Sequence, residues 1–229
     1  MAKPAAYFIA GTDTDVGKTT VAAGLLHAAR LRGASTLGAK PVASGCEQTA
    51  EGLRNADALA LMAESSMQLP YAAINPFSFA PAIAPHIAAQ EAGVALSVAG
   101  LLAPMRAVLA HNAGFTLIEG AGGWRVPLGG TEYLSGLAIG LGLPVILVVG
   151  VRLGCISHAL LSAEAIAGDG LVLAGWVANI IDPHTSRLDE NLATLAECLP
   201  APCLGRVPRL ANAQANAVAA YLDLTQLAP

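Results

Sequence analysis

Short apolar runs alternate along the chain with segments of helical periodicity. The apolar runs occupy residues 7–10, 35–39, 115–119, 145–149, 172–178 and 203–207. The helical patterns lie near residues 21–30, 55–65, 87–91, 97–111, 157–167, 187–199 and 214–222, and an irregular proline-rich stretch covers residues 70–85. Strands that alternate with helices favour a parallel sheet covered by helices on both faces. The pattern predicts a doubly wound, mostly parallel α/β fold in a single domain, residues 1–229.

One apolar stretch is long enough to suggest a membrane span. Residues 133–151 carry no formal charge, and a span of this length can cross a bilayer. Three glycines and Pro144 divide it into a short helix followed by a strand. A strand buried on both faces of a parallel sheet is also a continuous apolar run. We therefore expect no membrane segment, and residues 1–4, which lead directly into the first strand, predict no signal peptide.

The polar segment after the first strand has the features of a phosphate-binding P-loop. Residues 11–20 are Gly-Thr-Asp-Thr-Asp-Val-Gly-Lys-Thr-Thr, between a strand and a helix. Backbone N–H groups and the helix dipole would bind phosphate, Lys18 would contact the outer phosphates, and the Thr19 hydroxyl would ligate Mg²⁺. Thr12 stands where the usual spacing has its first glycine, and Gly11 comes one residue early. The segment predicts a nucleotide phosphate site and a P-loop NTPase-like fold.

Composition limits the class of partner. The chain has 229 residues, of which 55% are hydrophobic and 12% are charged, and its formal net charge is −4. This balance argues against nucleic acid or an anionic membrane as the main partner. The four cysteines form no Cys-x-x-Cys pair. They predict reduced thiols in the cytoplasm and neither a disulfide framework nor a zinc site.

Polar residues follow the predicted strands. Lys40 follows the second strand, Glu119 ends the third, and Arg152 and Asn179 follow later strands. In doubly wound sheets, ligands bind beyond the carboxyl ends of the strands. We expect Lys40 to lie at a strand end adjacent to the P-loop, where a second ammonium beside Lys18 would stabilise a transferring phosphoryl group or an anionic substrate. The alternative is a solvated lysine at a strand end.

Three oxygen-bearing side chains form a candidate magnesium site. Glu119 ends an apolar strand before a glycine-rich segment, and an acid at this position of P-loop enzymes completes the Mg²⁺ shell. Asp57 begins a predicted helix, so helix capping or interaction with the helix dipole is an equally good interpretation. Thr19, Asp57 and Glu119, together with phosphate oxygens and water, match the preference of Mg²⁺ for oxygen ligands.

Asn179 offers a weaker indication of the base that is bound. A carboxamide can pair with N6 and N7 of adenine, and a capping asparagine is the alternative. The Asn-Lys-x-Asp pattern of guanine-binding proteins would require Lys at position 180, where Ile stands. The segment therefore favours ATP over GTP.

An ordered set of motifs extends over nearly the whole chain. Its members are residues 11–19, 40–45, 51–58, 75–76, 85–86, 119–124, 145–151, 153–156 and 173–179. In this order the motifs resemble the dethiobiotin synthetase family. The resemblance implies an ATP-dependent cyclo-ligase. One amine of 7,8-diaminopelargonic acid takes up CO₂ as a carbamate, ATP phosphorylates the carbamate, and the second amine closes the cyclic urea with release of ADP and phosphate.

The resemblance also implies a set of site residues. Lys18 and Lys40 are the catalytic residues. The substrate-binding residues are Thr12, Asp15, Lys40, Ser44, Gly154 and Cys155. The nucleotide-binding residues are Asp15, Val16, Gly17, Lys18, Thr19, Thr20, Asp57, Glu119, Gly120, Ala121, Gly122, Asn179, Ile180, Val207, Pro208 and Arg209. The Mg²⁺ ligands are Thr19, Asp57 and Glu119.

A homodimer with the substrate site at the subunit interface is a further implication of the resemblance. A loop over residues 151–158, which includes His158, would reach the partner's substrate carboxylate through backbone amides. A glycine-containing loop after a strand suits this role. The chain departs from familiar bacterial members of the family at Asp15, Arg152 and Ser157.

Two other functions compete with this one. A related P-loop amidoligase would form an acyl phosphate, but such enzymes often carry a glutaminase domain, for which 229 residues leave no room. A nucleotide-switch ATPase of the partitioning type usually has an additional lysine at the position of Asp13, and some have a basic membrane helix. The predicted helix at residues 214–222 contains no basic residue, so it is a poor membrane anchor.

Overall fold

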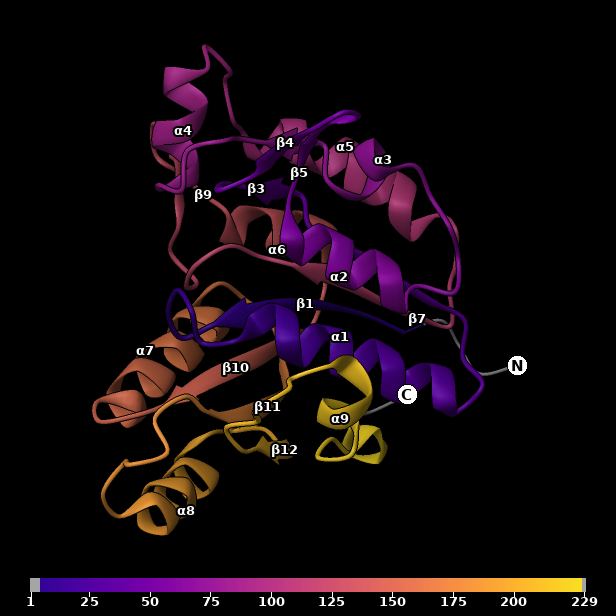
Figure 1. Cartoon of the computed structure of the whole chain (residues 1–229). Helices are drawn as coiled ribbons and strands as arrows, with labels where there is room; N and C mark the ends of the chain where they lie inside the picture. Colours follow the sequence, from indigo (N-terminus) through magenta and orange to yellow (C-terminus); the bar gives the residue numbers. More distant parts are fainter. Residues whose placement is uncertain (1–4, 228–229) are drawn as a thin grey trace.

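The computed structural model describes residues 5–227, and its centre is one six-stranded sheet (Figure 1). The strands are β1 (Ala5–Gly11), β2 (Thr36–Ala39), β7 (Phe115–Glu119), β10 (Val145–Val151), β11 (Leu173–Ile180) and β12 (Cys203–Val207). Their order is β12-β11-β10-β1-β7-β2, and every neighbouring pair is parallel. The α/β prediction is confirmed. Residues 1–4, on which the prediction about a signal peptide depends, lie outside the described residues.

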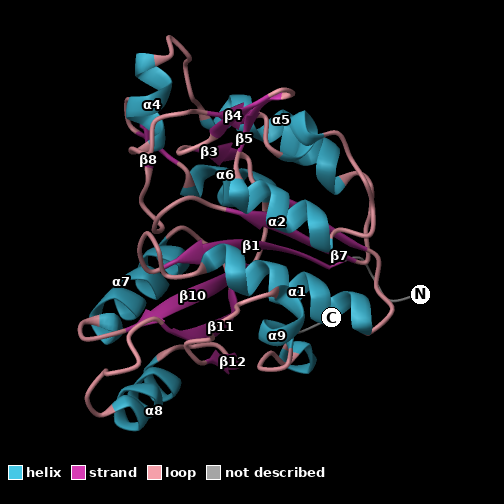
Figure 2. Cartoon of the chain, in the orientation of Figure 1, coloured by secondary structure: helices cyan, strands magenta, loops and turns pink. Residues whose placement is uncertain are grey.

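Helices cover both faces of the sheet (Figure 2). One face carries α1 (Lys18–Leu31), α2 (Ala56–Glu64), α9 (Ala215–Ala219) and the short 3₁₀ helix at Leu224–Gln226. The other face carries α5 (Val98–Leu109), α6 (Ser135–Leu141), α7 (Cys155–Gly168) and α8 (Leu188–Cys198). In β10, Leu147 and Val149 pack toward the second face, whereas Ile146 and Val148 pack toward α1. Burial on both faces explains why this strand is apolar throughout.

Residues 133–151 form no membrane-spanning helix, because glycines interrupt the stretch as expected. The stretch contains α6 and β10, and Gly142 ends α6 in the left-handed conformation with φ of 65°. Glycine adopts this conformation without the steric cost of a side chain. In the part of the chain that the structure describes, no helix is long and apolar enough to cross a membrane.

The connections contain short elements that the sequence pattern did not predict. Residues 70–85, expected to be irregular, include α3 (Tyr71–Ile74) and β6 (Phe77–Ser78), and α4 (Pro85–Glu91) follows them. Three small sheets pair β3 (Val42–Ala43) with β6, β4 (Glu47–Thr49) with β5 (Gly52–Arg54), and β8 (Pro127–Gly129) with β9 (Glu132–Tyr133). Strands of two or three residues are too short to show a period.

The predicted helix at residues 214–222 is too long. The structure ends α9 at Ala219, and Leu222 then forms a bridge with Gly205 of β12. The Asp223 amide also donates a hydrogen bond to the Leu204 carbonyl at 2.7 Å. Pairing with a strand requires extended backbone, so the contact with β12 overrides helical propensity here.

Two leucines of α1 test how strongly this helix depends on its packing against the sheet. Leu25 is completely buried, whereas Leu31 is 74% exposed. We expect Leu25→Ala to lower the free energy of unfolding by about 2–5 kcal/mol because it leaves a cavity. Leu31→Ala should change it by less than about 0.5 kcal/mol. Urea unfolding followed by circular dichroism measures both, and equal losses would contradict the assignment of α1 to the core.

Candidate nucleotide and substrate site

The P-loop connects β1 to α1. At two of its positions other side chains lie so close to the backbone that only glycine fits. Gly17 has φ of 84°, and a Cβ there would overlap the side-chain amide of Asn179. A Cβ at Gly11 would lie 2.9 Å from Lys18 Nζ. The glycine that precedes its usual position by one residue therefore gives Lys18 the space to fold back over the loop. No side chain caps the N-terminus of α1, which leaves its first N–H groups for an anion.

Lys18 is buried, and within residues 5–227 no carboxylate is in direct contact with its ammonium. It is 7% exposed, and Nζ donates a hydrogen bond to the Asp13 carbonyl oxygen at 2.9 Å. Burial, with repulsion from Lys40, lowers the pKa of Lys18 to about 8, although Glu119 and Asp57 partly oppose this. The Lys18 ammonium therefore lacks a full counter-charge in the free protein, and an anion such as phosphate would supply it.

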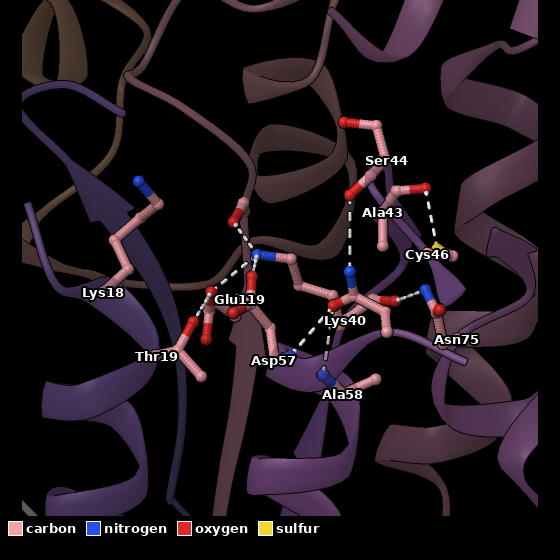
Figure 3. Close-up of polar contacts among 12 residues, drawn as sticks. Lys18, Thr19, Lys40, Ala43, Ser44, Cys46, Asp57, Ala58, Asn75 and Glu119 are labelled. Carbon is pink, nitrogen blue, oxygen red and sulfur yellow. Dashed lines mark hydrogen bonds and ion pairs between the residues drawn. The ribbon is translucent and has the colours of Figure 1, made fainter. Parts of the chain in front are cut away.

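Lys40 lies at the centre of a buried polar cluster (Figure 3). Its Nζ is 2.6 Å from Glu119 Oε1 and 2.9 Å from Asp57 Oδ2, and it donates to the Gly120 carbonyl oxygen at 3.1 Å. Burial by itself would lower the pKa of Lys40, but Glu119 and Asp57 raise it above its ordinary value. Burial by itself would raise the pKa of Asp57, but the charge and hydrogen bond of Lys40 lower it below its ordinary value. Lys40 is 4% exposed, so the solvated-lysine alternative is wrong.

Lys40 lies close to the P-loop, although its strand is not the direct neighbour of the P-loop strand. β7 lies between β1 and β2, and Glu119 ends β7. Glu119 Oε1 accepts hydrogen bonds from Lys40 Nζ at 2.6 Å and from Thr19 Oγ1 at 2.8 Å. The intervening strand therefore supplies the group that connects Lys40 with the first turn of α1.

The Asp57 side chain faces the cluster because another residue caps α2. Asn55 Oδ1 accepts hydrogen bonds from the backbone N–H groups of Asp57 at 3.0 Å and Ala58 at 3.3 Å. Asp57 is therefore not the helix cap, but it lies in the first turn of α2, where a carboxylate interacts favourably with the helix dipole. With capping supplied by Asn55, the Asp57 carboxylate is available to Lys40 and to a cation.

The oxygen atoms of the cluster fit a magnesium ion that arrives with phosphate. Thr19 and Lys40 both contact one oxygen of Glu119, while its other oxygen, Oε2, is buried and has no hydrogen-bond partner among the described residues. A buried acceptor without a partner is costly, and a cation or its bound water would satisfy it. Within residues 5–227, no three His, Cys, Asp or Glu side chains are grouped to hold a metal by themselves. Phosphate oxygens and water would have to complete the shell.

A cavity of about 860 Å³ brings together many of the predicted residues. Its lining includes Asp15, Gly17, Lys18, Thr19, Thr20, Lys40, Ser44, Asp57, Glu119, Ala121 and Gly122. Asn55, Arg125 and part of the segment before α4 also line it, and the sequence pattern did not indicate them. The P-loop forms one wall of the cavity, and the segment around Ser44 and Asn55 forms another.

Several predicted residues do not line this cavity. Val16 is buried, and its carbonyl oxygen accepts a hydrogen bond from the Asn179 amide at 2.8 Å. Thr12 Oγ1 accepts a hydrogen bond from the Gly150 backbone at 3.3 Å. The others are Gly120, Gly154, Cys155, Asn179, Ile180, Val207, Pro208 and Arg209. A second cavity of about 530 Å³ lies beyond Thr19 and Thr20 and is bounded by α1, α2 and residues 213–216.

The loop after β10 is shorter than expected. α7 begins at Cys155, so His158 lies in its first turn and not in a loop. The remaining loop contains Leu153, which is 96% exposed, and Arg152, whose Nη2 is 2.7 Å from Asp13 Oδ2. This ion pair joins the loop to the P-loop.

The two lysines of the cluster should differ in their effect on stability. Lys40→Met would leave the fully buried Glu119 without its ion-pair partner, and we expect a loss of about 3–5 kcal/mol in the free energy of unfolding. Lys18→Met should be nearly neutral, because burial of its charge is not fully compensated. Urea unfolding without nucleotide compares the variants, and similar losses would contradict this electrostatic picture.

Comparisons with known proteins agree with the nucleotide site that the geometry indicates. A family model described as an AAA domain matches residues 5–217. The ATP-dependent dethiobiotin synthetase BioD of Pseudomonas paraeruginosa is 72% identical over 222 residues, which are 97% of each chain. The enzyme of the same name from Cellvibrio japonicus is 60% identical over 97% of each chain, and that from Xanthomonas campestris is 48% identical over 96% of this chain and 98% of its own.

Solved structures show the fold alone. The signal recognition particle receptor FtsY from Elizabethkingia anophelis, in complex with GDP, matches with a TM-score of 0.50 at 14% identity, over 95% of this chain and 60% of that longer chain. FtsY from Thermotoga maritima has a TM-score of 0.50 at 19% identity over 93% of this chain and 67% of its own. Distant proteins thus share the fold of this chain, whereas the relatives named above also share its sequence over nearly the full length. On that identity, the chain belongs to the family of ATP-dependent dethiobiotin synthetases.

Proposed function

We propose that this protein converts 7,8-diaminopelargonic acid, CO₂ and ATP to dethiobiotin, ADP and phosphate, as a cytoplasmic enzyme formed of one domain per subunit. The observation that carries the proposal is the buried ion pair of Lys40 and Glu119, together with the half-buried Asp57 and Thr19, beside the P-loop at the wall of the 860 Å³ cavity. The cluster supplies fixed charge and contains no activated nucleophile. Family membership supports the reaction.

This reaction depends on positioning and on charge stabilisation. The carbamate oxygen attacks the γ-phosphorus of ATP, and the bond to the ADP oxygen breaks. The second amine then attacks the carbamate carbon, inorganic phosphate leaves, and the amine loses its proton as the ring closes. Lys18 and Lys40 would stabilise negative charge on the carbamate and the transferring phosphoryl group. Asp15, Ser44 and Thr12 would orient the diamine and its carbamate.

Thr19, Asp57 and Glu119 would hold Mg²⁺. When bound, the ion would neutralise charge on the phosphate oxygens and orient them for transfer. Glu119 would contact the cation or its bound water through Oε2, which has no hydrogen-bond partner among the described residues, while Oε1 keeps its contact with Lys40. Lys40 would remain close to the reacting carbamate.

ATP would extend from the P-loop toward the ends of β11 and β12. Residues 15–20 and 120–122 would surround the phosphates, and Asn179, Ile180 and residues 207–209 would contact adenine. The Asn179 amide already donates to the P-loop carbonyl of Val16. The side-chain oxygen of Asn179 would then accept a hydrogen bond from the N6 amino group of adenine.

A homodimer would complete the substrate site. Gly154 has φ of 93° and Cys155 begins α7, so backbone N–H groups are concentrated where the loop enters the helix. Leu153 beside them is 96% exposed, which suits a subunit contact better than a solvated surface. These amides would bind the substrate carboxylate of the partner subunit.

The test of the reaction is ADP release with Mg·ATP and bicarbonate, measured with and without 7,8-diaminopelargonic acid. We expect release to depend on the diamine and to match dethiobiotin formed, as quantified by mass spectrometry. Tight ATP binding with no dependence on the diamine, in protein shown to be folded, would overturn the ligase proposal and favour the nucleotide-switch ATPase.

Proton uptake tests the assignment of Lys18 to the phosphates. Since its pKa in the free protein is about 8, Lys18 is largely neutral at higher pH and would regain its proton beside the bound phosphates. We expect uptake of roughly one proton per nucleotide near pH 9 and roughly a quarter near pH 7.5. Calorimetric titration in buffers of different ionisation enthalpy measures this. Equal uptake by Lys18→Met would remove Lys18 from the phosphate site.

A further inference from the structure

A buried hydrogen-bond network connects the Lys40 backbone with the start of α2. The Tyr71 hydroxyl accepts a hydrogen bond from the Asn55 backbone N–H at 2.7 Å and donates one to Asn75 Oδ1 at 2.8 Å. Asn75 Nδ2 donates to the Lys40 carbonyl oxygen at 2.6 Å. Asn55 and Asn75 are 6% and 3% exposed. One hydroxyl thus joins the two backbone segments that carry Lys40 and Asp57.

Each end of the network fixes one member of the ion pair. On one side, the Asn55 side chain caps α2 and holds the backbone of Asp57 at 3.0 Å. On the other side, the Lys40 backbone is held twice, through its carbonyl by Asn75 and through its N–H by the Ile74 carbonyl at 3.0 Å. The Lys40–Asp57 distance of 2.9 Å therefore depends on how these two segments are spaced.

The ring of Tyr71 and its partner Asn75 are both held in place, which fixes the position of the Tyr71 hydroxyl. Its ring packs under the Arg54 guanidinium, whose central carbon is 4.3 Å from the ring centroid. Asn75 uses its amide group for two carbonyls and its oxygen for the hydroxyls of Tyr71 and Ser78. Buried polar networks that are fully satisfied specify one geometry. Phenylalanine would keep the ring contacts and remove both hydrogen bonds of the hydroxyl.

We propose that Tyr71 is a positioning residue for the reaction, because its hydroxyl sets the separation of Lys40 and Asp57 through Asn75 and Asn55. The expected effect of Tyr71 on turnover rests on the proposed function. A small displacement of groups that stabilise a transition state is costly. Tyr71 itself lies outside the lining of the cavity, so it would act only through these neighbours.

The test compares Tyr71→Phe with a matched control, Thr36→Val. Thr36 is completely buried, and its hydroxyl also makes one donated and one accepted bond, to the Glu64 carbonyl at 2.7 Å and from the Ser66 N–H at 2.9 Å. These bonds join β2 to the opposite end of α2. Both variants therefore lose a bridging hydroxyl, but only Tyr71→Phe loses it beside the site.

We expect Tyr71→Phe to lower kcat about tenfold with KM for ATP nearly unchanged, while Thr36→Val stays within about twofold of the wild type. Melting temperatures should fall similarly in both. Equal kcat losses at equal melting temperatures would overturn the proposal, since the loss would then reflect general stability. A kcat of Tyr71→Phe equal to that of the wild type would also overturn it.

A double-mutant cycle with Asp57→Asn separates action through Asp57 from an independent effect. If Tyr71 acts by placing Asp57, adding Tyr71→Phe to Asp57→Asn should lower kcat/KM by less than about threefold further. Additive losses would contradict the route through Asp57.

Hydrogen exchange gives a readout that does not require turnover. The Asn55 amide should exchange about tenfold faster in Tyr71→Phe and at the wild-type rate in Thr36→Val. Unchanged Asn55 exchange in Tyr71→Phe would contradict the network. If the wild-type protein shows no diamine-dependent ADP release, the proposed function fails, and the exchange result still decides whether Tyr71 holds the start of α2.

Discussion

The buried ion pair between Lys40 and Glu119 constrains the surrounding structure. Two side chains that are 5% and 0% exposed carry opposite charges 2.6 Å apart, and neither charge could remain in the interior without the other. Lys40 follows β2 and Glu119 ends β7, so the pair requires these strands to be neighbours in register. The parallel pairing of Ala39 with Ile118 provides this arrangement.

Glu119 extends the constraint to the P-loop. The same carboxylate oxygen that contacts Lys40 also accepts the hydrogen bond from Thr19. Strand β7 lies between the P-loop strand and β2, and its last residue therefore transmits the position of one to the other. The second carboxylate oxygen has no partner within the described residues. Lys40 is thus paired with two carboxylates, while one oxygen of Glu119 remains available to a cation.

The distant structural similarity and the close sequence similarity describe different things. FtsY matches the fold of this chain at 14–19% identity, and a fold by itself is compatible with many functions. In this chain, the segment around Lys40, Asn55 and Asp57 places a second lysine and a carboxylate beside the P-loop. Chemistry beyond phosphate binding would depend on this addition.

Local sequence determined the elements whose signal is contained within a few neighbouring residues. Apolar runs gave the six main strands, and the glycine pattern with Lys18 and Thr19 gave the loop between β1 and α1. The same local signals predicted polar residues at strand ends, where Lys40 and Glu119 do meet. Periodicity and turn chemistry act within a chain segment, so one sequence suffices to show them.

Only the tertiary structure decided which of those residues touch. The order of β7 and β2 and the end of α9 at its contact with β12 depend on partners distant in sequence. Tyr71 carried no signal, because an isolated tyrosine in a proline-rich stretch has no pattern that names Asn55 and Asn75 as its partners. A hydrogen bond selects its partner by position in space, and that position exists only after the chain has folded.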